Sequence, residues 1–139
     1  MSDAAPGGVH HVAIAVRDLE AAESFYTGVL RLPVLRRWPM AGDERRDRSV
    51  WLDLGEGAFL ALERAEAEIA RAGAPAERSQ GYLMIALRIS RAARADWEGR
   101  LAAAGVAVVH RTDYTLYVAD PEGNRVGLSH WPAAADETG

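Results

Sequence analysis

His11 is the residue of this chain whose type and position point first to chemistry. It begins the segment HVAIAV, in which bulky and small side chains alternate, so that His11, Ala13 and Ala15 share one face of a predicted half-buried strand. Imidazole titrates near neutral pH, so His11 could hydrogen-bond a ligand or act as a general base. The spacing alone leaves both interpretations open.

Aromatic side chains provide a second kind of candidate site residue. Trp38, Trp51, Phe59 and Trp131 could each stack on a flat ligand. Single aromatic residues more often serve packing, and this alternative applies to each of the four.

The absence of two residue types excludes several reaction classes. The chain has no cysteine, which removes disulfides, thiolate nucleophiles and zinc-cysteine sites. All sixteen basic residues are arginine, so neither a Schiff-base lysine nor a phosphate-binding P-loop lysine can exist. The sequence also lacks the G-x-S-x-G and G-x-G-x-x-G motifs, which argues against a serine hydrolase and a dinucleotide-binding fold.

Length and composition indicate one soluble globular domain. The 139 residues are 49% hydrophobic and 26% charged, with a net charge of −4. This acidic balance argues against a nucleic-acid partner, and the basic cluster at 36–48 is interleaved with acidic residues, which favours a solvated loop over an anion site. No apolar run reaches the roughly 18 residues of a membrane span, and no signal peptide is evident. We therefore expect a cytoplasmic protein with no membrane partner.

The first half of the chain predicts a βαβββ module at residues 9–63. A strand is followed by a helix that Asp18 can cap, in the segment DLEAAESFYTGVL. Three short strands follow, at residues 33–38, 48–54 and 58–63. An alanine-rich linker at about 64–80, broken by glycine and proline, ends the module.

The second half repeats this order in a module at residues 81–132. The segment GYLMIALRI alternates as a strand, Ser90 can cap the next helix, and Gly105 suits a left-handed helix end. Three strand candidates follow, with the sequences VAVVH, YTLYV and RVGLSHW. Two copies of one unit predict a pseudo-symmetric α+β domain over residues 9–132, with flexible ends at 1–8 and 133–139.

Each module should pack its bulky aliphatic strand faces on its own helix. The opposite faces carry a mixture of small, aromatic and polar side chains, which suits the wall of a curved-sheet cavity. A solvent-facing sheet surface is the alternative. We predict a ligand-binding set on these faces, consisting of Trp51, Phe59, Ala61, Glu63, Met84, Arg125, Gly127 and Ser129.

Two motifs at the ends of this repeat resemble the vicinal oxygen chelate superfamily, which includes glyoxalase I, bleomycin-binding proteins and extradiol dioxygenases. The first is HHVAIAVRDLEAAESFYTGVLRLPV (10–34) and the second is LYVADPEGNRVGLSHWP (116–132). The resemblance implies two βαβββ modules that form curved mixed sheets around a cavity. It also implies a homodimer, because members of this superfamily commonly complete their cavities by pairing modules, and the pairing can occur within one chain or across a dimer.

The resemblance further implies where a metal ion would bind. Metal-dependent members take four ligands from four strands, and these positions fall on His11, Ala61, Met84 and Gly127, with Glu63 two residues after Ala61. Divalent first-row ions prefer imidazole and carboxylate groups, so His11 is the one retained ligand-type residue. We therefore predict no metal and no other cofactor, and expect the space beside Gly127 to be open to an organic ligand.

A further part of the resemblance concerns proton transfer. His110, Leu116 and Tyr117, followed by Asp120 and Pro121, are similar to an extradiol-dioxygenase pattern in which the histidine and tyrosine flank the substrate. Imidazole and phenol groups could still act as a proton-transfer pair. The alternative is that Tyr117 lines the cavity and His110 lies at a solvated strand end.

Three functions follow from these observations. The first is a metal-free protein that binds a drug or metabolite in the sheet cavity. The second is a metal-free isomerase, cyclase or lyase that uses His11, Tyr117 and His110 as catalytic residues. The third is a metal-dependent glyoxalase-like or dioxygenase-like enzyme whose ligands lie at other positions.

Overall fold

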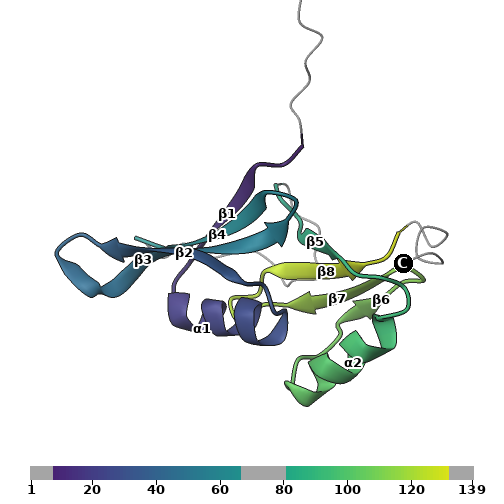
Figure 1. The fold of residues 1–139 in the computed structure, drawn as a ribbon. Helices are drawn as coiled ribbons and strands as arrows, with labels where there is room; N and C mark the ends of the chain where they lie inside the picture. The colour runs from purple at the N-terminus through teal and green to yellow at the C-terminus, as the bar shows by residue number, and fades with distance from the viewer. Residues whose placement is uncertain (1–7, 67–80, 132–139) are drawn as a thin grey trace, which may run out of the picture. The chain divides into compact units, whose positions relative to one another are not determined.

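The computed structural model describes residues 8–66 and 81–131, which belong to two compact units divided after Glu68 (Figure 1). Each unit contains one four-stranded mixed sheet and the helical segments of one βαβββ repeat. The predicted α+β class with two βαβββ modules is therefore confirmed. The predicted linker at 64–80 and the predicted flexible ends lie almost entirely outside the described residues.

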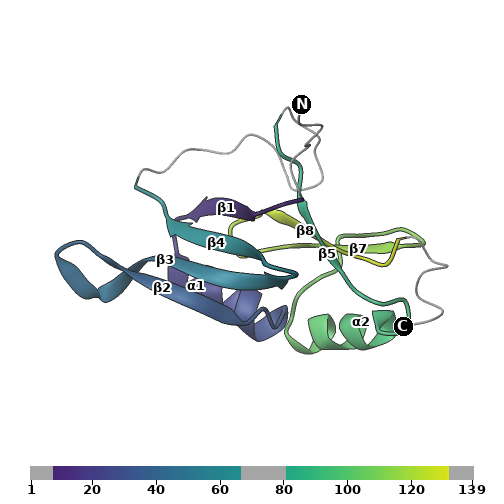
Figure 2. The same ribbon diagram turned by 45° about the horizontal axis from the view of Figure 1, so that its top comes forward.

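The first unit contains sheet A, in which the strand order is β1-β4-β3-β2. Its strands are β1 (His11–Val16), β2 (Val34–Met40), β3 (Asp43–Gly55) and β4 (Ala58–Arg64). β1 is parallel to β4, and the other neighbouring strands are antiparallel. The helical segments α1 (Leu19–Glu23) and η1 (Ser24–Val29) follow β1 and lie on one side of this sheet (Figure 2).

The first helix begins where the sequence predicts and changes character after one turn. The Asp18 carboxylate accepts a hydrogen bond from the Ala21 backbone amide at 2.9 Å, as expected for an N-cap. From Ser24 the segment is a π-helix, and the Leu30 amide donates to the Phe25 carbonyl five residues earlier. The sequence predicted one continuous α-helix here, and the structure differs from that prediction in having a π-helix from Ser24 to Val29.

The basic cluster at 36–48 is not a loop, and that prediction was wrong. It forms the ends of β2 and β3, which are joined by a tight turn in which Gly42 has φ +82°. The alternating charges pair across the strands: the Arg37 guanidinium donates to Asp47 at 2.8 Å and also binds Glu23 on α1. The same mixture of charges that is typical of a solvated loop can also stabilise a hairpin, because opposite charges pair across its strands.

The second unit contains sheet B, in which the strand order is β5-β8-β7-β6. Its elements are β5 (Ile85–Arg88), α2 (Arg94–Ala103), β6 (His110–Arg111), β7 (Thr115–Ala119) and β8 (Arg125–Ser129). β5 is parallel to β8, as β1 is to β4 in sheet A. The strands here are shorter than predicted, most of all the candidate at 106–110, which contributes only His110 to β6.

Ser90 caps a turn that precedes α2 instead of capping α2 itself. Its hydroxyl accepts from the Ala93 amide at 3.1 Å, and the helix begins one residue later at Arg94. At the other end Gly105 has φ +73°, and its amide donates to the Ala102 carbonyl. The glycine end of this helix is therefore as predicted.

The D-P-x-G-N segment forms a turn organised by one buried carboxylate. Asp120 Oδ1 accepts from the amides of Glu122 and Asn124, at 2.9 and 2.8 Å, and Oδ2 accepts from the Asn124 side-chain amide at 2.7 Å. Gly123 has φ +84°, a conformation that glycine adopts without strain. This turn determines where β8 begins.

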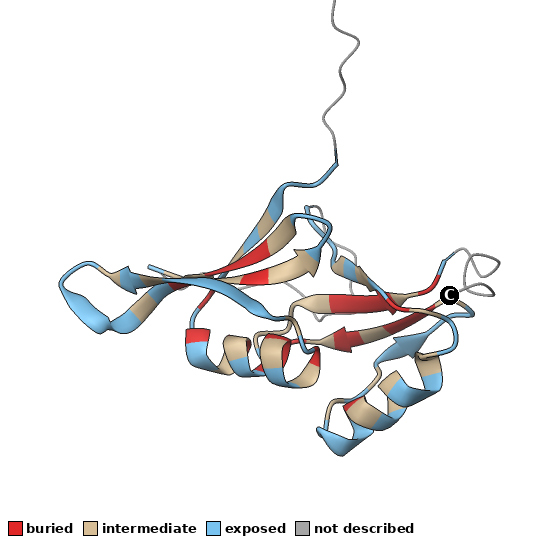
Figure 3. Ribbon diagram, in the orientation of Figure 1, coloured by how far each residue is buried: buried red, intermediate tan, exposed pale blue. Residues whose placement is uncertain are grey.

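Each sheet buries one aliphatic face, as predicted. In sheet A the fully buried residues of this face are Val50, Leu52, Leu60 and Leu62, on the strands that α1 contacts (Figure 3). In sheet B the corresponding residues are Leu116, Val118, Val126 and Leu128. Within the described ranges, none of the helices has the length and apolarity that a membrane crossing requires.

Candidate functional site

The face of sheet A opposite α1 and η1 carries five of the predicted site residues. His11, Trp51, Phe59, Ala61 and Glu63 all occur on it, because alternate residues of each strand point to the same side. We call this surface the aromatic face; its members are His11, Ala13, Ala15, Arg36, Trp38, Ser49, Trp51, Asp53, Phe59, Ala61 and Glu63.

Four rings form a continuous row across all four strands of this face. The ring centroids of His11 and Phe59 are 4.8 Å apart, those of Phe59 and Trp51 are 4.4 Å apart, and those of Trp51 and Trp38 are 5.2 Å apart. The first two pairs are stacked, with interplanar angles of 5° and 23°, at about the ~4.8 Å spacing of neighbouring strands. The rings of His11, Phe59 and Trp51 therefore stand upright side by side with their edges outward, whereas the Trp38 ring is tilted by 60° to that of Trp51. We call these four residues the aromatic row.

The far end of the aromatic row is covered by a cation. The Arg36 guanidinium carbon lies 3.8 Å from the centroid of the Trp38 ring, which is a cation–π contact. The faces of the rings are thus occupied within the row, and the outward edges remain for other molecules.

Polar groups next to the row lack partners within the described residues. Ser49 is 1% exposed, and neither its hydroxyl nor Trp38 Nε1 makes a hydrogen bond. A buried unpaired polar group costs about 1–3 kcal/mol. Ser49 pairs across the sheet with Trp38 on one side and with Glu63 on the other, and the half-buried Glu63 carboxylate has no ion pair there.

His10 is a residue that the sequence reasoning missed. Strand alternation would point it away from His11, but β1 begins only at His11, so alternation does not apply to His10. Its Nδ1 lies 2.9 Å from His11 Nδ1, and its ring also contacts Phe59 edge-to-face. One imidazole must donate and the other accept in this contact, so a hydrogen bond joins the two rings.

The corresponding face of sheet B carries the other predicted site residues. Arg125, Gly127 and Ser129 of β8, Tyr117 of β7, His110 of β6, and Met84 directly before β5 belong to it. We call this surface the Gly127 face, and its further members are Ala86, Arg88, Thr115 and Ala119.

The structure brings His110 and Tyr117 together, although their catalytic role stays a prediction. They are cross-strand partners, and their ring centroids are 5.6 Å apart. The Arg125 guanidinium lies 5.7 Å from the Tyr117 ring, and Arg125 Nε is buried without a hydrogen-bond partner in the described chain. Ser129 is occupied, because its hydroxyl accepts from the Thr115 hydroxyl at 2.9 Å.

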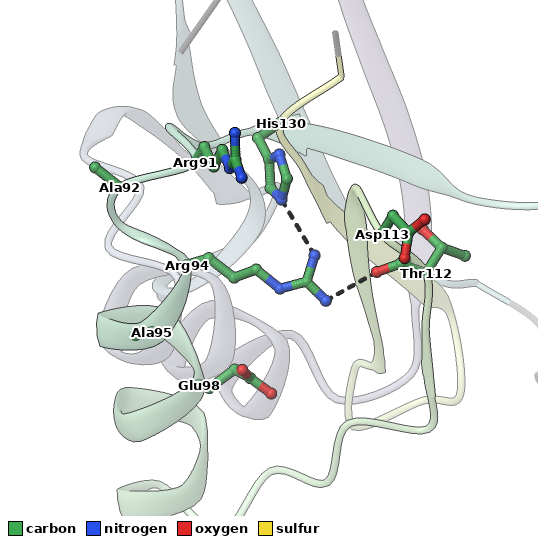
Figure 4. A pocket seen from close by; sticks show the side chains of 8 residues that line it. All are labelled: Arg91, Ala92, Arg94, Ala95, Glu98, Thr112, Asp113 and His130. Carbon is green, nitrogen blue, oxygen red and sulfur yellow. Dashed lines mark hydrogen bonds between the residues drawn. The ribbon is translucent and has the colours of Figure 1, made fainter. Parts of the chain in front are cut away.

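A hollow at the start of α2 was not predicted from the sequence (Figure 4). It is lined by Arg91, Ala92, Arg94, Ala95, Glu98, Thr112, Asp113 and His130. The Arg94 guanidinium lies 3.1 Å from His130 Nε2 and donates to the Thr112 carbonyl at 2.9 Å, which fixes α2 to the ends of β7 and β8. The other residues that line the hollow carry both positive and negative charges, and this mixture favours no particular ligand.

Comparison with known proteins gives the family. The family model for the glyoxalase/bleomycin resistance protein/dioxygenase superfamily matches residues 8–128. The chain belongs to this superfamily. No curated protein matches it significantly.

Solved structures of the same superfamily share the fold at low sequence identity. A glyoxalase/dioxygenase from Nostoc punctiforme is 22% identical, covers 95% of this chain and 98% of its own, and has a TM-score of 0.79. The fosfomycin resistance protein FosX from Mesorhizobium loti is 19% identical over 97% and 100% of the two chains, with a TM-score of 0.68. The antibiotic binding protein TnmS3 from Streptomyces sp. CB03234 is 21% identical over 91% and 98%, with a TM-score of 0.64.

The positions at which the sequence predicts the superfamily's metal ligands have the same register in both units. Ala13 pairs with Ala61 in the parallel β1–β4 ladder, and Ala86 pairs with Gly127 in the parallel β5–β8 ladder. His11 and Met84 each lie two residues before these alanines of β1 and β5. Within the described ranges, no group of three or more His, Asp or Glu residues could hold a metal ion.

The space beside Gly127 is narrower than expected. A Cβ atom at this position would lie 3.2 Å from the γ-methyl of Thr115, 3.5 Å from Met84 Sδ and 3.6 Å from the Ala86 methyl. The expectation that a missing glutamate leaves open space at this point is wrong. Neighbouring side chains have closed around the glycine.

Proposed function

We propose that this chain binds a small organic molecule and does so without the metal ion of its superfamily. The observation that carries the proposal is the donor set at the four ligand positions: one imidazole, two positions without donor atoms and a thioether. Thioethers are soft ligands that suit copper(I) better than the divalent ions bound by imidazole and carboxylate. The closed packing around Gly127 further supports a site that no longer serves a metal.

The aromatic face supports an organic ligand in place of the ion. It combines ring edges, exposed alanine methyl groups on β1 and a carboxylate without a partner in the described part of the chain, a mixture typical of small-molecule sites. The superfamily fold is also that of the antibiotic binding protein TnmS3, which supports a binding function for this chain.

Elemental analysis tests the metal-free part of the proposal. Protein purified from medium supplemented with nickel, zinc, iron and manganese should contain none of them stoichiometrically, and ligand affinity should not change on addition of a chelator. The His11→Ala variant serves as the control, because wild-type and variant metal contents should be equal. One bound ion per chain, lost on this substitution, would restore the metal-enzyme interpretation.

A metal-free acid/base enzyme is the second candidate, and the contact between His10 and His11 favours it. Two imidazoles joined by a hydrogen bond provide a base and a proton reservoir at one point of the aromatic face. In this case His11→Ala should abolish turnover and spare substrate binding, whereas His130→Ala on sheet B should spare turnover. Full activity of the His11 variant would exclude this candidate.

The homodimer implied by the superfamily is a further proposal. Light scattering coupled to size-exclusion chromatography should give twice the chain mass of 15.0 kDa.

A further inference from the structure

We propose that the aromatic face of sheet A recognises an arylalkylamine, with its ammonium group at Glu63 and its ring on the edges of the aromatic row. This inference rests on the small-molecule function proposed above and specifies the chemical class of its ligand.

Glu63 is the acidic group of this face that remains free to bind a cation. The other carboxylate, Asp53, accepts a hydrogen bond from the Gly55 amide at 2.8 Å in the turn after β3. Glu63 is half-buried and has no partner in the described chain, and its neighbour across the β1–β4 ladder is the small, exposed residue Ala15. A cation that approaches over Ala15 therefore meets a carboxylate whose charge no arginine of residues 8–66 or 81–131 neutralises.

The unpaired Ser49 hydroxyl is a second, independent sign of a missing hydrogen-bonding group. It is almost fully buried, and it belongs to the cross-strand partner of Glu63. Trp38 is the cross-strand partner of Ser49 on β2, and its Nε1 also has no hydrogen-bond partner among the described residues. A ligand nitrogen with several N–H donors at Glu63 could also donate to the Ser49 hydroxyl after a small side-chain adjustment, which a neutral apolar ligand could not do.

The aromatic row determines what kind of ring suits the ligand. Because three of its rings stand upright, they present positively polarised edges to a molecule above them. Such edges attract the electron-rich face of a neutral ring and disfavour a ring that itself carries positive charge. The ring and the charge of the ligand should therefore be separate groups joined by a spacer.

The spacing of the strands determines the length of that spacer. Trp51 pairs with Ala61, two residues before Glu63 on β4, and residues two apart along a strand are separated by about 7 Å. An extended two-carbon chain places an ammonium nitrogen about 5 Å from the centre of an aryl ring, and a hydrogen bond of about 2.8 Å from that nitrogen to the carboxylate covers the rest of the distance. An arylethylamine thus spans the distance between the two features.

Three probes that share one naphthylethyl group and differ in the charge of the attached group test this inference by isothermal titration calorimetry on the full chain. They are 2-(1-naphthyl)ethylammonium, 2-(1-naphthyl)ethanol and 3-(1-naphthyl)propanoate. The ammonium probe should bind about tenfold more tightly than the alcohol, which is the usual gain from a charge-assisted hydrogen bond, and the propanoate should bind most weakly.

Two substitutions then separate the contributions of the charge and of the ring. Glu63→Gln should make the ammonium and alcohol affinities equal and leave the alcohol affinity unchanged, whereas Trp51→Leu should weaken both probes. Asp96→Asn removes the same charge from an exposed position on α2 and is the matched control, which should keep the wild-type order. Circular dichroism verifies that each variant is folded.

The outcomes distinguish this inference from the proposed function. Equal affinity for the three probes, no binding of any of them, or an ammonium preference that survives Glu63→Gln would overturn the arylalkylamine assignment. Binding of the alcohol alone would overturn it as well and leave metal-free small-molecule binding intact. Stoichiometric metal in the purified protein would instead contradict the proposed function.

Discussion

The two units have the same topology and ladder register but present different chemistry on corresponding faces. In sheet A this face carries four rings in a row and the Glu63 carboxylate, which has no partner among the residues that the structure describes. In sheet B it carries the arginine Arg125, one tyrosine next to a histidine, and a glycine enclosed by its neighbours. The difference shows that a repeated backbone specifies where a site can be and leaves its chemistry to individual side chains.

Truncation of a leucine on the aliphatic face should lower stability by a similar amount in the two units, because the residues concerned are fully buried in both. Leu62→Ala in sheet A and Leu128→Ala in sheet B should each lower the free energy of unfolding by about 2–5 kcal/mol, since each leaves a cavity in a core. Urea denaturation followed by circular dichroism measures this. A loss below about 1 kcal/mol in one unit only would show that its core is not comparably packed.

Substitution at Gly127, a predicted metal-ligand position, should lower stability without creating a metal site. Gly127→Glu should cost about 1–3 kcal/mol, because the new side chain enters the space held by Thr115 and Met84. It should not produce metal binding, because two further ligands are still missing. Thermal unfolding with and without zinc measures both effects, and stabilisation by stoichiometric zinc would contradict the assignment of ligand positions.

A smaller change at the same position tests the packing directly. Gly127→Ala should be close to neutral, since the entropy gained over glycine, about 0.5–1 kcal/mol, is offset by the 3.2 Å contact with the Thr115 methyl. Thr115→Ser removes this methyl group and retains the hydroxyl that binds Ser129. The double variant should therefore be more stable than the sum of the single effects predicts. Additive free energies would refute the proposed contact.

Removing one of the ion pairs that join each helix to its sheet should have the smallest effect on the free energy of unfolding. Arg64 donates to Glu20 at 2.8 Å, and this hydrogen bond holds the pKa of Glu20 below its ordinary value. Glu20→Gln should cost less than about 1 kcal/mol at pH 7, because Glu20 is 68% exposed.

The pH dependence of that cost follows from the direction of the pKa shift. A carboxyl group whose folded pKa is lowered stabilises the protein above its unfolded pKa, and this contribution is lost as the pH falls through the folded value. The difference between wild-type and Glu20→Gln should thus disappear in acid below the ordinary glutamate range. Glu98→Gln, which removes the pair with Arg111 in the second unit, is the comparison. A difference that grows in acid would contradict the lowered pKa.

Much of the fold could be predicted because it depends on local patterns. Strand alternation, the Asp18 cap and the glycine at the end of α2 all act within a few residues, and the structure retains them. The hairpin at 36–48 was missed because its charges pair with residues across the strand, which a single segment does not reveal. The π-helical turn was missed because its hydrogen bonds do not change the periodicity enough to be read from sequence.

The candidate site was predictable as a set of faces and less so as a set of contacts. Alternation placed His11, Trp51, Phe59 and Glu63 on one face correctly. It could not show that the rings stack upright, that His10 turns toward His11, or that Ser49 lacks a partner. These facts depend on side-chain rotamers and on the ladder register, which neither composition nor spacing specifies.

The turn at Asp120 gives the D-P-x-G-N motif a structural role that does not depend on metal chemistry. By fixing the first residue of β8, the turn decides which side of the sheet each later residue faces. A slip by one position would turn Val126 and Leu128 out of the core and put Arg125, Gly127 and Ser129 in their place. The D-P-x-G-N segment therefore sets the alignment of the strand that follows, and it remains useful to the fold whether or not that strand carries a metal ligand.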